Sequence, residues 1–248
     1  MPLGNCPRVV GPGAALRWSG TARSPIIPPT PEETSAAMSS DKHSSWSYTE
    51  ALPVEDDVVT RARERAHELG VDPVGPGVAA LLQVLAANSK ARTVVEVGSG
   101  VGVSGVSLLR GLSAQAVFTT IDIDVDHLNA ARQAYLDAGI PANRTRTIGG
   151  RARDVLPRLT DGAYDLVFID ADKPNLVEYA EHGVRLLRSG GMLVINDALD
   201  HDRVPQPAVR DRSTVAARQV GRLLRENDDL VVTTVPTGSG LLLAVRIA

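Results

Sequence analysis

Two short polar stretches, each directly after an apolar run rich in β-branched residues, carry side chains that could do chemistry. Asp170, Asp172 and Lys173 follow the first run, and Asn196 and Asp197 follow the second. If both runs are neighbouring strands of a parallel sheet, their carboxyl ends meet at one edge, which is where open α/β sheets bind ligands. We therefore expect these side chains to converge on a ligand crevice. The plain alternative, in which acids at strand ends only cap the helices that follow, accounts for any one of them more easily than for all together.

A glycine-rich stretch, residues 92–105, predicts a strand, a tight turn and a helix. The apolar run ends in Gly98, Gly100 and Gly102, which permit positive φ and let a ligand approach the backbone closely. The helix that begins near Val103 then directs its free N–H groups and the positive end of its dipole toward the same point. Because an ordinary turn needs only one glycine, the pattern indicates a nucleotide-like ligand.

Two kinds of nucleotide fit this turn. Residues 100–105 match the GxGxxG pattern and Asp122 lies about twenty residues beyond it, so an NAD(P)-dependent oxidoreductase is one interpretation. Glu96 favours S-adenosylmethionine, because an acid beside the turn attracts the ammonium and sulfonium groups of that molecule and repels a pyrophosphate. Asp122 can accept hydrogen bonds from ribose hydroxyls in either case. A third interpretation is a regulator that binds S-adenosylmethionine without catalysis.

The elements that would position these residues alternate along the chain. We expect strands at residues 93–97, 116–122, 144–148, 164–169 and 191–195, and helices at 103–111, 125–138, 151–159 and 174–188. Such alternation is typical of a parallel sheet with right-handed crossovers. A helix near residues 209–227 then leads to strands at 230–236 and 240–247, whose short connection permits only an antiparallel hairpin. The predicted fold is therefore α/β and Rossmann-like, with a seven-stranded, mostly parallel sheet that ends in an antiparallel hairpin.

The chain before the first strand falls into two parts. Residues 1–45 are rich in Pro, Gly, Ser and Thr without apolar periodicity, so we expect a disordered extension there, with Met38 as an alternative initiator. The foldable domain then runs over residues 46–248. It opens with helical patterns at 53–69 and 77–87, and the rigid loop between them could reach back over the glycine turn.

Composition limits the partners and the compartment. The 248 residues carry a formal net charge of -3, without the basic excess of a nucleic-acid binder, and no apolar run approaches the roughly 18 residues of a membrane span. The single cysteine, Cys6, excludes an intramolecular disulfide and fits a reducing compartment. We therefore expect a cytoplasmic protein that binds neither nucleic acid nor membrane.

The stretch Phe168–Lys173, with the sequence FIDADK, resembles the F-x-D-A-D-K pattern of the cation-dependent O-methyltransferases of the catechol and caffeoyl-CoA type. The similarity runs from about Val54 to the C-terminus, and its specificity comes from combining this stretch with Glu96–Ser104, Ile121–Asp122 and Asn196–Asp197. The resemblance implies a class I S-adenosylmethionine methyltransferase fold. It also implies methyl transfer to a hydroxyl of a small acceptor, such as a vicinal diol, and a homodimer.

The resemblance also assigns roles to individual residues. It implies a metal at Asp170, Asn196 and Asp197, although the family's pair reads Asp-Asn where this chain reads Asn-Asp. Carboxylate and amide oxygens are hard ligands that suit Mg²⁺ or Ca²⁺, and a divalent cation that anchors two acceptor oxygens makes a nucleophilic side chain unnecessary. We expect Ser104 to donate to the cofactor carboxylate and Asp172 to hold its ammonium. The implied cofactor contacts are Val74, Glu96, Gly98, Ser99, Ser104, Asp122, Ala152 and Asp172.

Few side chains are available to hold a planar acceptor, because aromatic residues make up only 3% of the chain. Trp46 and Tyr179 are the nearest candidates. His201 is either an ordinary loop residue or, by the resemblance, a polar contact to the acceptor.

Lys173 is the candidate for proton transfer. The chain has 26 basic residues but uses lysine only at Lys42, Lys90 and Lys173, so a lysine in the strand-end crevice is unusual for it. Lysine can lose its proton near a cation, whereas arginine effectively cannot, so Lys173 could accept the proton of the acceptor hydroxyl. The alternative is chance placement, with Lys173 only an electrostatic neighbour of the metal. We assign Lys173 and Asp170 as the catalytic candidates.

Overall fold

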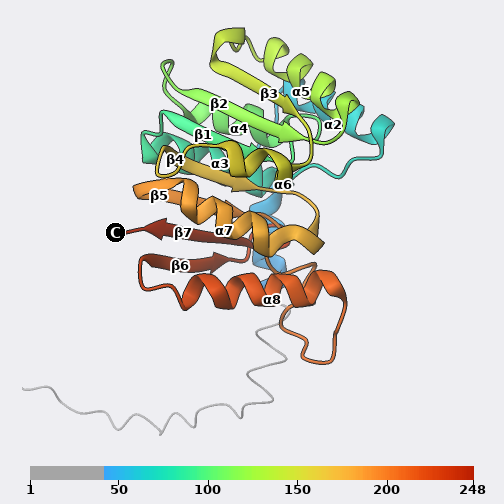
Figure 1. Ribbon diagram of the computed structural model, residues 1–248. Helices are drawn as coiled ribbons and strands as arrows, with labels where there is room; N and C mark the ends of the chain where they lie inside the picture. The colour runs from blue at the N-terminus through green and yellow to red at the C-terminus, as the bar shows by residue number, and fades with distance from the viewer. Residues whose placement is uncertain (1–41) are drawn as a thin grey trace, which may run out of the picture. The chain divides into compact units, whose positions relative to one another are not determined.

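The computed structural model describes residues 42–248, which contain one seven-stranded sheet with helices on both faces (Figure 1). The strand order is β3-β2-β1-β4-β5-β7-β6; β1 to β5 pair in parallel, and β7 is antiparallel to both β5 and β6. This arrangement confirms the predicted α/β sheet with its C-terminal hairpin. The strands are β1 Thr93–Val97, β2 Val117–Asp122, β3 Thr145–Gly149, β4 Tyr164–Ile169, β5 Leu187–Ile195, β6 Leu230–Val235 and β7 Leu241–Arg246.

Helices cover both faces of the sheet. They comprise a helix at residues 42–51 and α2 Asp57–Leu69, α3 Pro76–Ser89, α4 Val103–Gly111, α5 Val125–Asp137, α6 Ala152–Val155, α7 Leu176–Leu186 and α8 Arg212–Arg225, with 3-10 turns at Ala142–Arg144, Leu156–Arg158 and Lys173–Asn175. In Figure 1, α7 and α8 lie in front of the sheet, and α3 and α4 lie behind it. Two apolar cores result, one between the sheet and α2–α5 and the other between the sheet and α6–α8.

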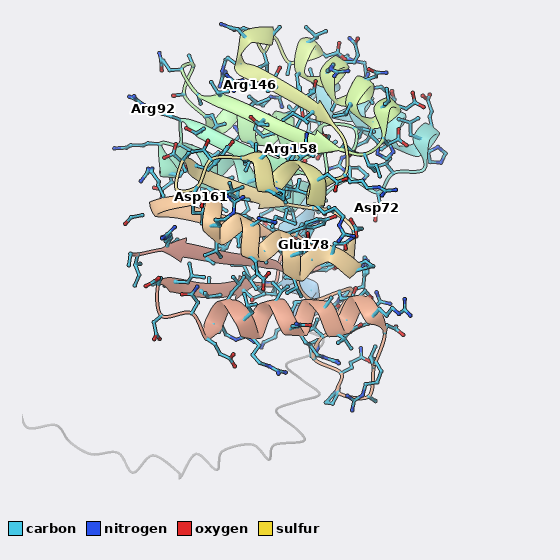
Figure 2. The ribbon with its side chains drawn as sticks, viewed as in Figure 1. Asp72, Arg92, Arg146, Arg158, Asp161 and Glu178 are labelled. Carbon is cyan, nitrogen blue, oxygen red and sulfur yellow. The ribbon has the colours of Figure 1, made fainter. Side chains whose placement is uncertain are left out.

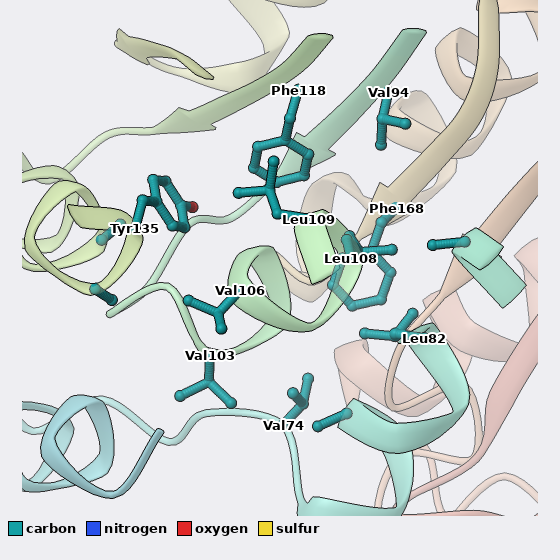
Figure 3. Close-up of a cluster of buried hydrophobic side chains, with 14 of the residues drawn as sticks. Val74, Leu82, Val94, Val103, Val106, Leu108, Leu109, Phe118, Tyr135 and Phe168 are labelled. Atoms are coloured by element: carbon teal, nitrogen blue, oxygen red, sulfur yellow. The ribbon is translucent and has the colours of Figure 1, made fainter. Parts of the chain in front are cut away.

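Large side chains from the central strands anchor the first core (Figure 3). Phe118 of β2 and Phe168 of β4 are fully buried, and the ring of Tyr135 from α5 lies edge-on to Phe118 with 5.9 Å between ring centroids. Leu108 and Leu109 of α4 belong to the same cluster. Full burial of side chains of this size stabilises the fold by about 1.5–3 kcal/mol each. The core therefore fixes α4, whose first turn faces the carboxyl edge of the sheet.

Several predicted boundaries differ from the structure by one to four residues, and proline explains two of the differences. The expected helix 151–159 divides into α6 and a 3-10 turn, because Pro157 lacks a backbone donor and its ring would clash with the preceding turn of an α-helix. The expected helix 174–188 begins only after a 3-10 turn that contains Pro174. β5 begins at Leu187, earlier than predicted, because the consecutive glycines Gly190 and Gly191 lie within the strand and do not end it.

The helix at residues 42–51 was not predicted. It includes the last residues of the expected extension 1–45. The remainder of that extension, residues 1–41 with Cys6 and Met38, lies outside the described residues. None of the helices within residues 42–248 is long and apolar enough to cross a membrane.

Asp165 ties strands together at the edge where the parallel strands begin. Its buried carboxylate accepts hydrogen bonds from the N–H groups of Arg92 (2.7 Å) and Thr93 (2.8 Å) and pairs with the guanidinium of Arg188. Burial alone would raise the pKa of Asp165, but these donors outweigh it and hold the pKa below its usual value. Figure 2 shows Arg92 at this edge and Asp72 near the opposite one.

At the opposite edge, backbone hydrogen bonds continue the sheet into the loops. The N–H of Gly98 donates to the carbonyl of Ile121, and that of Asp170 donates to the carbonyl of Val97, both at 2.8 Å. Gly98 has a φ of 92°, and a Cβ at this position would overlap the carbonyl oxygen of Asp170. Only a residue without a side chain therefore lets the ends of β1 and β4 lie so close.

Gly98→Ala should destabilise the fold far more than Gly139→Ala. Both glycines have a left-handed φ, 92° and 69°, which costs an alanine about 1–2 kcal/mol, but nothing lies within 4 Å of a Cβ at Gly139. We expect urea denaturation to show a loss of more than about 3 kcal/mol for Gly98→Ala and about 1 kcal/mol for Gly139→Ala. Equal losses would mean that the close approach of the strand ends is not limiting.

Candidate active site

Three cavities open at the carboxyl edge of the sheet, and Asp170 lines all of them. The glycine-loop cavity, of about 470 Å³, lies at the ends of β1, β2 and β4. The side cavity, of about 100 Å³, lies between the glycine loop and residues 71–74. The acidic cavity, of about 560 Å³, lies between residues 72–78, the end of β5 and the β6–β7 turn. A ligand in the glycine-loop cavity would therefore meet a ligand in the acidic cavity at Asp170.

Seven of the eight residues predicted to hold the cofactor line the first two cavities. Figure 3 shows one of them, Val74, at the border of the first core. The eighth, Glu96, lines neither cavity. The glycine-loop cavity contains Gly98, Asp122, Ala152 and Asp172, and the side cavity contains Val74, Ser99 and Ser104 with Gly98 again.

Glu96 lies fully buried beneath the glycine loop. Ser104 donates to its Oε1 at 2.6 Å, the hydroxyl of Thr120 lies 2.6 Å from its Oε2, and Thr120 in turn lies 2.5 Å from the hydroxyl of Ser99. Burial outweighs these hydrogen bonds and raises the pKa of Glu96 to about 8. This pKa favours the protonated, uncharged form of Glu96 at neutral pH. The hydroxyl of Ser104, expected to face a cofactor carboxylate, donates to Glu96.

Asp122 holds the glycine loop in place. Its Oδ2 accepts hydrogen bonds from the N–H groups of Ser99 (2.9 Å) and Gly100 (3.0 Å), and its Oδ1 accepts one from the N–H of Asp124 (2.9 Å). Nδ1 of His127 lies 3.5 Å from the same Oδ1. A carboxylate has about four acceptor positions, so Asp122 keeps capacity for a hydroxyl in the cavity that it lines.

Asp172 and Tyr179 act together on the far wall of the glycine-loop cavity. The hydroxyl of Tyr179 donates to Oδ1 of Asp172 at 2.7 Å, and the amide of Asn175 donates to Oδ2 at 2.6 Å. Burial raises the pKa of Tyr179, and the neighbouring Asp172 raises it further. Tyr179 therefore lines the glycine-loop cavity and not the acidic cavity.

Carboxylates dominate the acidic cavity. No lysine or arginine is among the described residues that line it. The cavity therefore concentrates negative charge where the predicted metal ligands lie. Trp46 is on its wall, and so is His201, whose Nδ1 lies 3.1 Å from the hydroxyl of Ser239. The five carboxylates that line it are Glu50, Asp72, Asp170, Asp197 and Asp202.

The three predicted metal ligands meet in this cavity but differ in their contacts. Oδ1 of Asp170 accepts a hydrogen bond from the amide of Asn196 at 3.0 Å. Asp197, with a φ of 50°, lies 3.1 Å from the ammonium of Lys173 and accepts from the N–H of His201 at 3.2 Å. Burial raises the pKa of Asp170, and the charges of Asp197 and another aspartate oppose its ionisation further. Within residues 42–248, no cluster of three or more His, Cys, Asp or Glu side chains could hold a metal ion by itself. A site built on Asp170 and Asp197 would therefore also need the amide oxygen of Asn196.

Lys173 lies behind the acidic cavity and lines none of the three cavities. Its Nζ donates to the backbone carbonyls of Asn196 (3.2 Å) and Asp197 (3.0 Å) and lies 3.1 Å from Oδ2 of Asp197. Three acceptors match the three protons of an ammonium group. In this arrangement Lys173 holds the turn after β5, and its role as a proton acceptor stays a prediction.

Three titratable residues illustrate what was not found from the sequence. His127 could have been found, because it lies in the first turn of the helix that follows Asp122 and that turn must face the same edge. Asp72 lies in the loop that was expected to cover the glycine turn, so its position was available but its role was not. Glu50 had no signal, because the helix that carries it was not predicted.

The fold and its acid-lined edge define a Rossmann-like methyltransferase, and the chain belongs to the O-methyltransferase family, whose model matches residues 54–247. It is similar to a probable O-methyltransferase of Mycobacterium tuberculosis, with 48% identity over 203 residues, 82% of this chain and 91% of the relative. It is also similar to a provisionally named O-methyltransferase of Mycobacterium ulcerans, with 46% identity over 92% of this chain and 99% of the relative. The family decides against an oxidoreductase and against a non-catalytic regulator.

Solved structures agree with this assignment. The O-methyltransferase TomG of Streptomyces achromogenes, involved in tomaymycin synthesis and solved with S-adenosylmethionine, gives a TM-score of 0.74 at 27% identity over 81% of this chain and 94% of its own. An O-methyltransferase of Bacillus cereus, solved with S-adenosylhomocysteine, gives a TM-score of 0.74 at 25% identity over 82% of this chain and 97% of its own. The expected class of enzyme is confirmed.

Glu96→Gln should change how stability depends on pH. The fold raises the pKa of Glu96 from 4.5 to about 8, so the folded chain keeps a proton that the unfolded chain releases between these values. This group therefore lowers the free energy of unfolding as pH rises through that range, by up to about 1.4 kcal/mol per pH unit. Glutamine keeps the shape of the protonated acid and should remove this part of the slope.

Urea unfolding of the two proteins between about pH 5.5 and 8 measures the difference in slope. Glu68→Gln, on the exposed surface of α2, is the matched control and should follow the wild type. Parallel curves for Glu96→Gln and the wild type would mean that Glu96 is ionised in the fold.

Proposed function

We propose that the protein transfers a methyl group from S-adenosylmethionine to a hydroxyl of a small acceptor, with a divalent cation holding the acceptor. The observation that carries the proposal is the position of Asp170, which lines the glycine-loop cavity and the acidic cavity together. A donor in the first cavity would face an acceptor oxygen in the second. The Streptomyces and Bacillus relatives support the cofactor, because their structures contain S-adenosylmethionine and its demethylated product.

The glycine-loop cavity offers groups that match S-adenosylmethionine. Asp122 has capacity for the ribose hydroxyls, and the exposed carboxylate of Asp172 can attract the ammonium or the sulfonium. Gly98 and Gly100 also line this cavity, where they present backbone without side chains. Because Glu96 is protonated, Asp122, Asp170 and Asp172 supply the negative charge on this side.

The donor set of the acidic cavity fits a hard divalent cation such as Mg²⁺ or Ca²⁺. Asp170, Asn196 and Asp197 supply two carboxylates and one amide, and the reversed order of the last two leaves that set unchanged. The raised pKa of Asp170 reflects burial first, and the charges of Asp197 and Asp72 add to it; a bound cation would oppose these effects. When bound, the cation would favour ionisation of the acceptor hydroxyl and stabilise the resulting oxyanion. Acceptors with two vicinal hydroxyls fit best, because both oxygens can reach one ion.

The chain itself mainly orients the two reactants. The sulfonium is already electrophilic, so the protein needs to align the acceptor oxygen with the methyl carbon and to exclude water. Orientation of this kind can supply about 7–11 kcal/mol of the barrier reduction. The wall formed by Trp46 and Val78 gives the acidic cavity an apolar surface against which a flat acceptor can lie.

Activity should depend on a divalent cation. With labelled S-adenosylmethionine and a panel of vicinal diols, we expect methylation to stop in excess EDTA and to return with Mg²⁺, because the carboxylates alone would repel the oxyanion. Asn196→Ala and Asp197→Ala, assayed side by side, should each raise the Mg²⁺ requirement by at least about tenfold. Full activity in EDTA would mean that the reaction needs no divalent cation, while the proposal of methyl transfer would remain.

Lys173→Arg separates proton transfer from a scaffolding role. Arginine keeps a positive charge and donors for the carbonyls of Asn196 and Asp197 but cannot serve as a base. If Lys173 accepts the hydroxyl proton, turnover should fall by about 10²–10⁴-fold with normal cofactor binding, and it should recover as rising pH ionises the acceptor. Turnover near the wild-type value at neutral pH would show that Lys173 only holds the turn.

A further inference from the structure

Glu50 makes contacts that the proposed reaction does not use. Its Oε1 accepts hydrogen bonds from the hydroxyl of Thr237 (2.7 Å) and the N–H of Gly238 (2.8 Å), and its Oε2 accepts one from the N–H of Gly77 (3.2 Å). Gly77 lies in the first turn of α3, and the other two residues lie in the β6–β7 turn. One carboxylate therefore joins helix 42–51 to two segments that are distant from it in sequence.

The first turn of α3 is built to receive this carboxylate. The N-cap residue, Gly75, offers no side-chain hydrogen bond, so the free N–H groups of the helix start are available to Glu50. A negative charge is also favourable at this end of the helix dipole. At Gly77 a Cβ would overlap the carboxylate of Glu50, so only glycine leaves room for the contact.

Glu50 is the most buried residue of helix 42–51. Residues 42–49 and 51 are exposed, and Glu50 alone is half-buried. Trp46 lies four residues before Glu50 and so on the same side of the helix, and both side chains line the acidic cavity. Apart from Trp46, which is 38% exposed, the helix buries little apolar surface, so the polar contacts of Glu50 contribute much of what holds Trp46 in place.

We propose that Glu50 is a positioning residue that fixes helix 42–51 as one wall of the acidic cavity and so sets the Trp46 ring against a planar, hydroxylated acceptor. The inference rests on the proposed function in one respect, namely that the acceptor occupies the acidic cavity. Glu50 touches neither reactant in this assignment. It acts on the acceptor through the place of Trp46.

Two variants break the contact from opposite sides. Glu50→Gln removes the charge and one of the two acceptor oxygens, and Gly77→Ala displaces the carboxylate with a methyl group. Because alanine is the better helix former, Gly77→Ala should not lower the melting temperature, which separates the lost contact from misfolding. Glu68→Gln is the matched control on an exposed surface.

Fluorescence tests the position of the helix without any assay of activity. The chain has two tryptophans, Trp18 and Trp46, so a Trp18→Phe background makes Trp46 the sole reporter. We expect acrylamide to quench Trp46 more strongly in Glu50→Gln and in Gly77→Ala than in the background protein or in Glu68→Gln. Unchanged quenching in both variants would overturn the proposal.

Kinetics test the consequence for the acceptor. With 3,4-dihydroxybenzoate as the probe, the KM should rise about tenfold in each variant, while kcat and the dissociation constant of S-adenosylmethionine stay near their wild-type values. The double variant should be no worse than either single one, because both remove the same contact. An equal weakening of cofactor binding would overturn the proposal in favour of a general loosening. If the wild type does not methylate the probe, the diol part of the proposed function fails, and quenching alone decides the role of Glu50.

Discussion

The close approach of two strand ends determines where everything in the site can lie. Because Gly98 has no side chain, the backbone of Asp170 rests against the glycine loop, and the carboxylate of Asp170 reaches the wall between two cavities. Asp122 fixes the loop from the side of β2 with two backbone hydrogen bonds. The glycine-loop cavity and the acidic cavity are thus two halves of one arrangement that meets at a half-buried acid, Asp170.

The acids near this edge lie in different surroundings, and these surroundings influence which of them carry a negative charge. Glu96 is sealed beneath the loop with only hydroxyl partners, so burial keeps it neutral. Five carboxylates line the acidic cavity, and Lys173, which pairs with Asp197 and also acts to lower the pKa of Asp170, does not line it. Negative charge therefore stays on the cavity walls, where a cationic ligand can use it.

Most of the fold could be predicted from the sequence, because strands that alternate with helices pair in parallel, as β1 to β5 do, and the short connection between β6 and β7 allows only an antiparallel pair. The limits of β1, β4 and α4 coincide with their predictions, whereas the helices predicted across Pro157 and Pro174 are shorter in the structure than expected. That the site residues gather at one edge also follows from topology alone. The partners of individual groups do not: Ser104 donates to Glu96, Lys173 donates to two carbonyls, and Glu50 reaches a turn that is 187 residues away. Such contacts depend on packing between elements that no local pattern describes.

The tie at Asp165 lies at the edge remote from the cavities. Its donors come from the start of β1 and from Arg188 in β5, and none of these residues lines one of the three cavities. The tie at Asp165 is therefore separate from the side chains that line the cavities. Apart from the glycine loop, which holds the strand ends together, loops on the ligand side can change in length and composition over evolution while this tie is kept. A lineage built on this chain can thus acquire new acceptors by drift at one edge of the sheet alone.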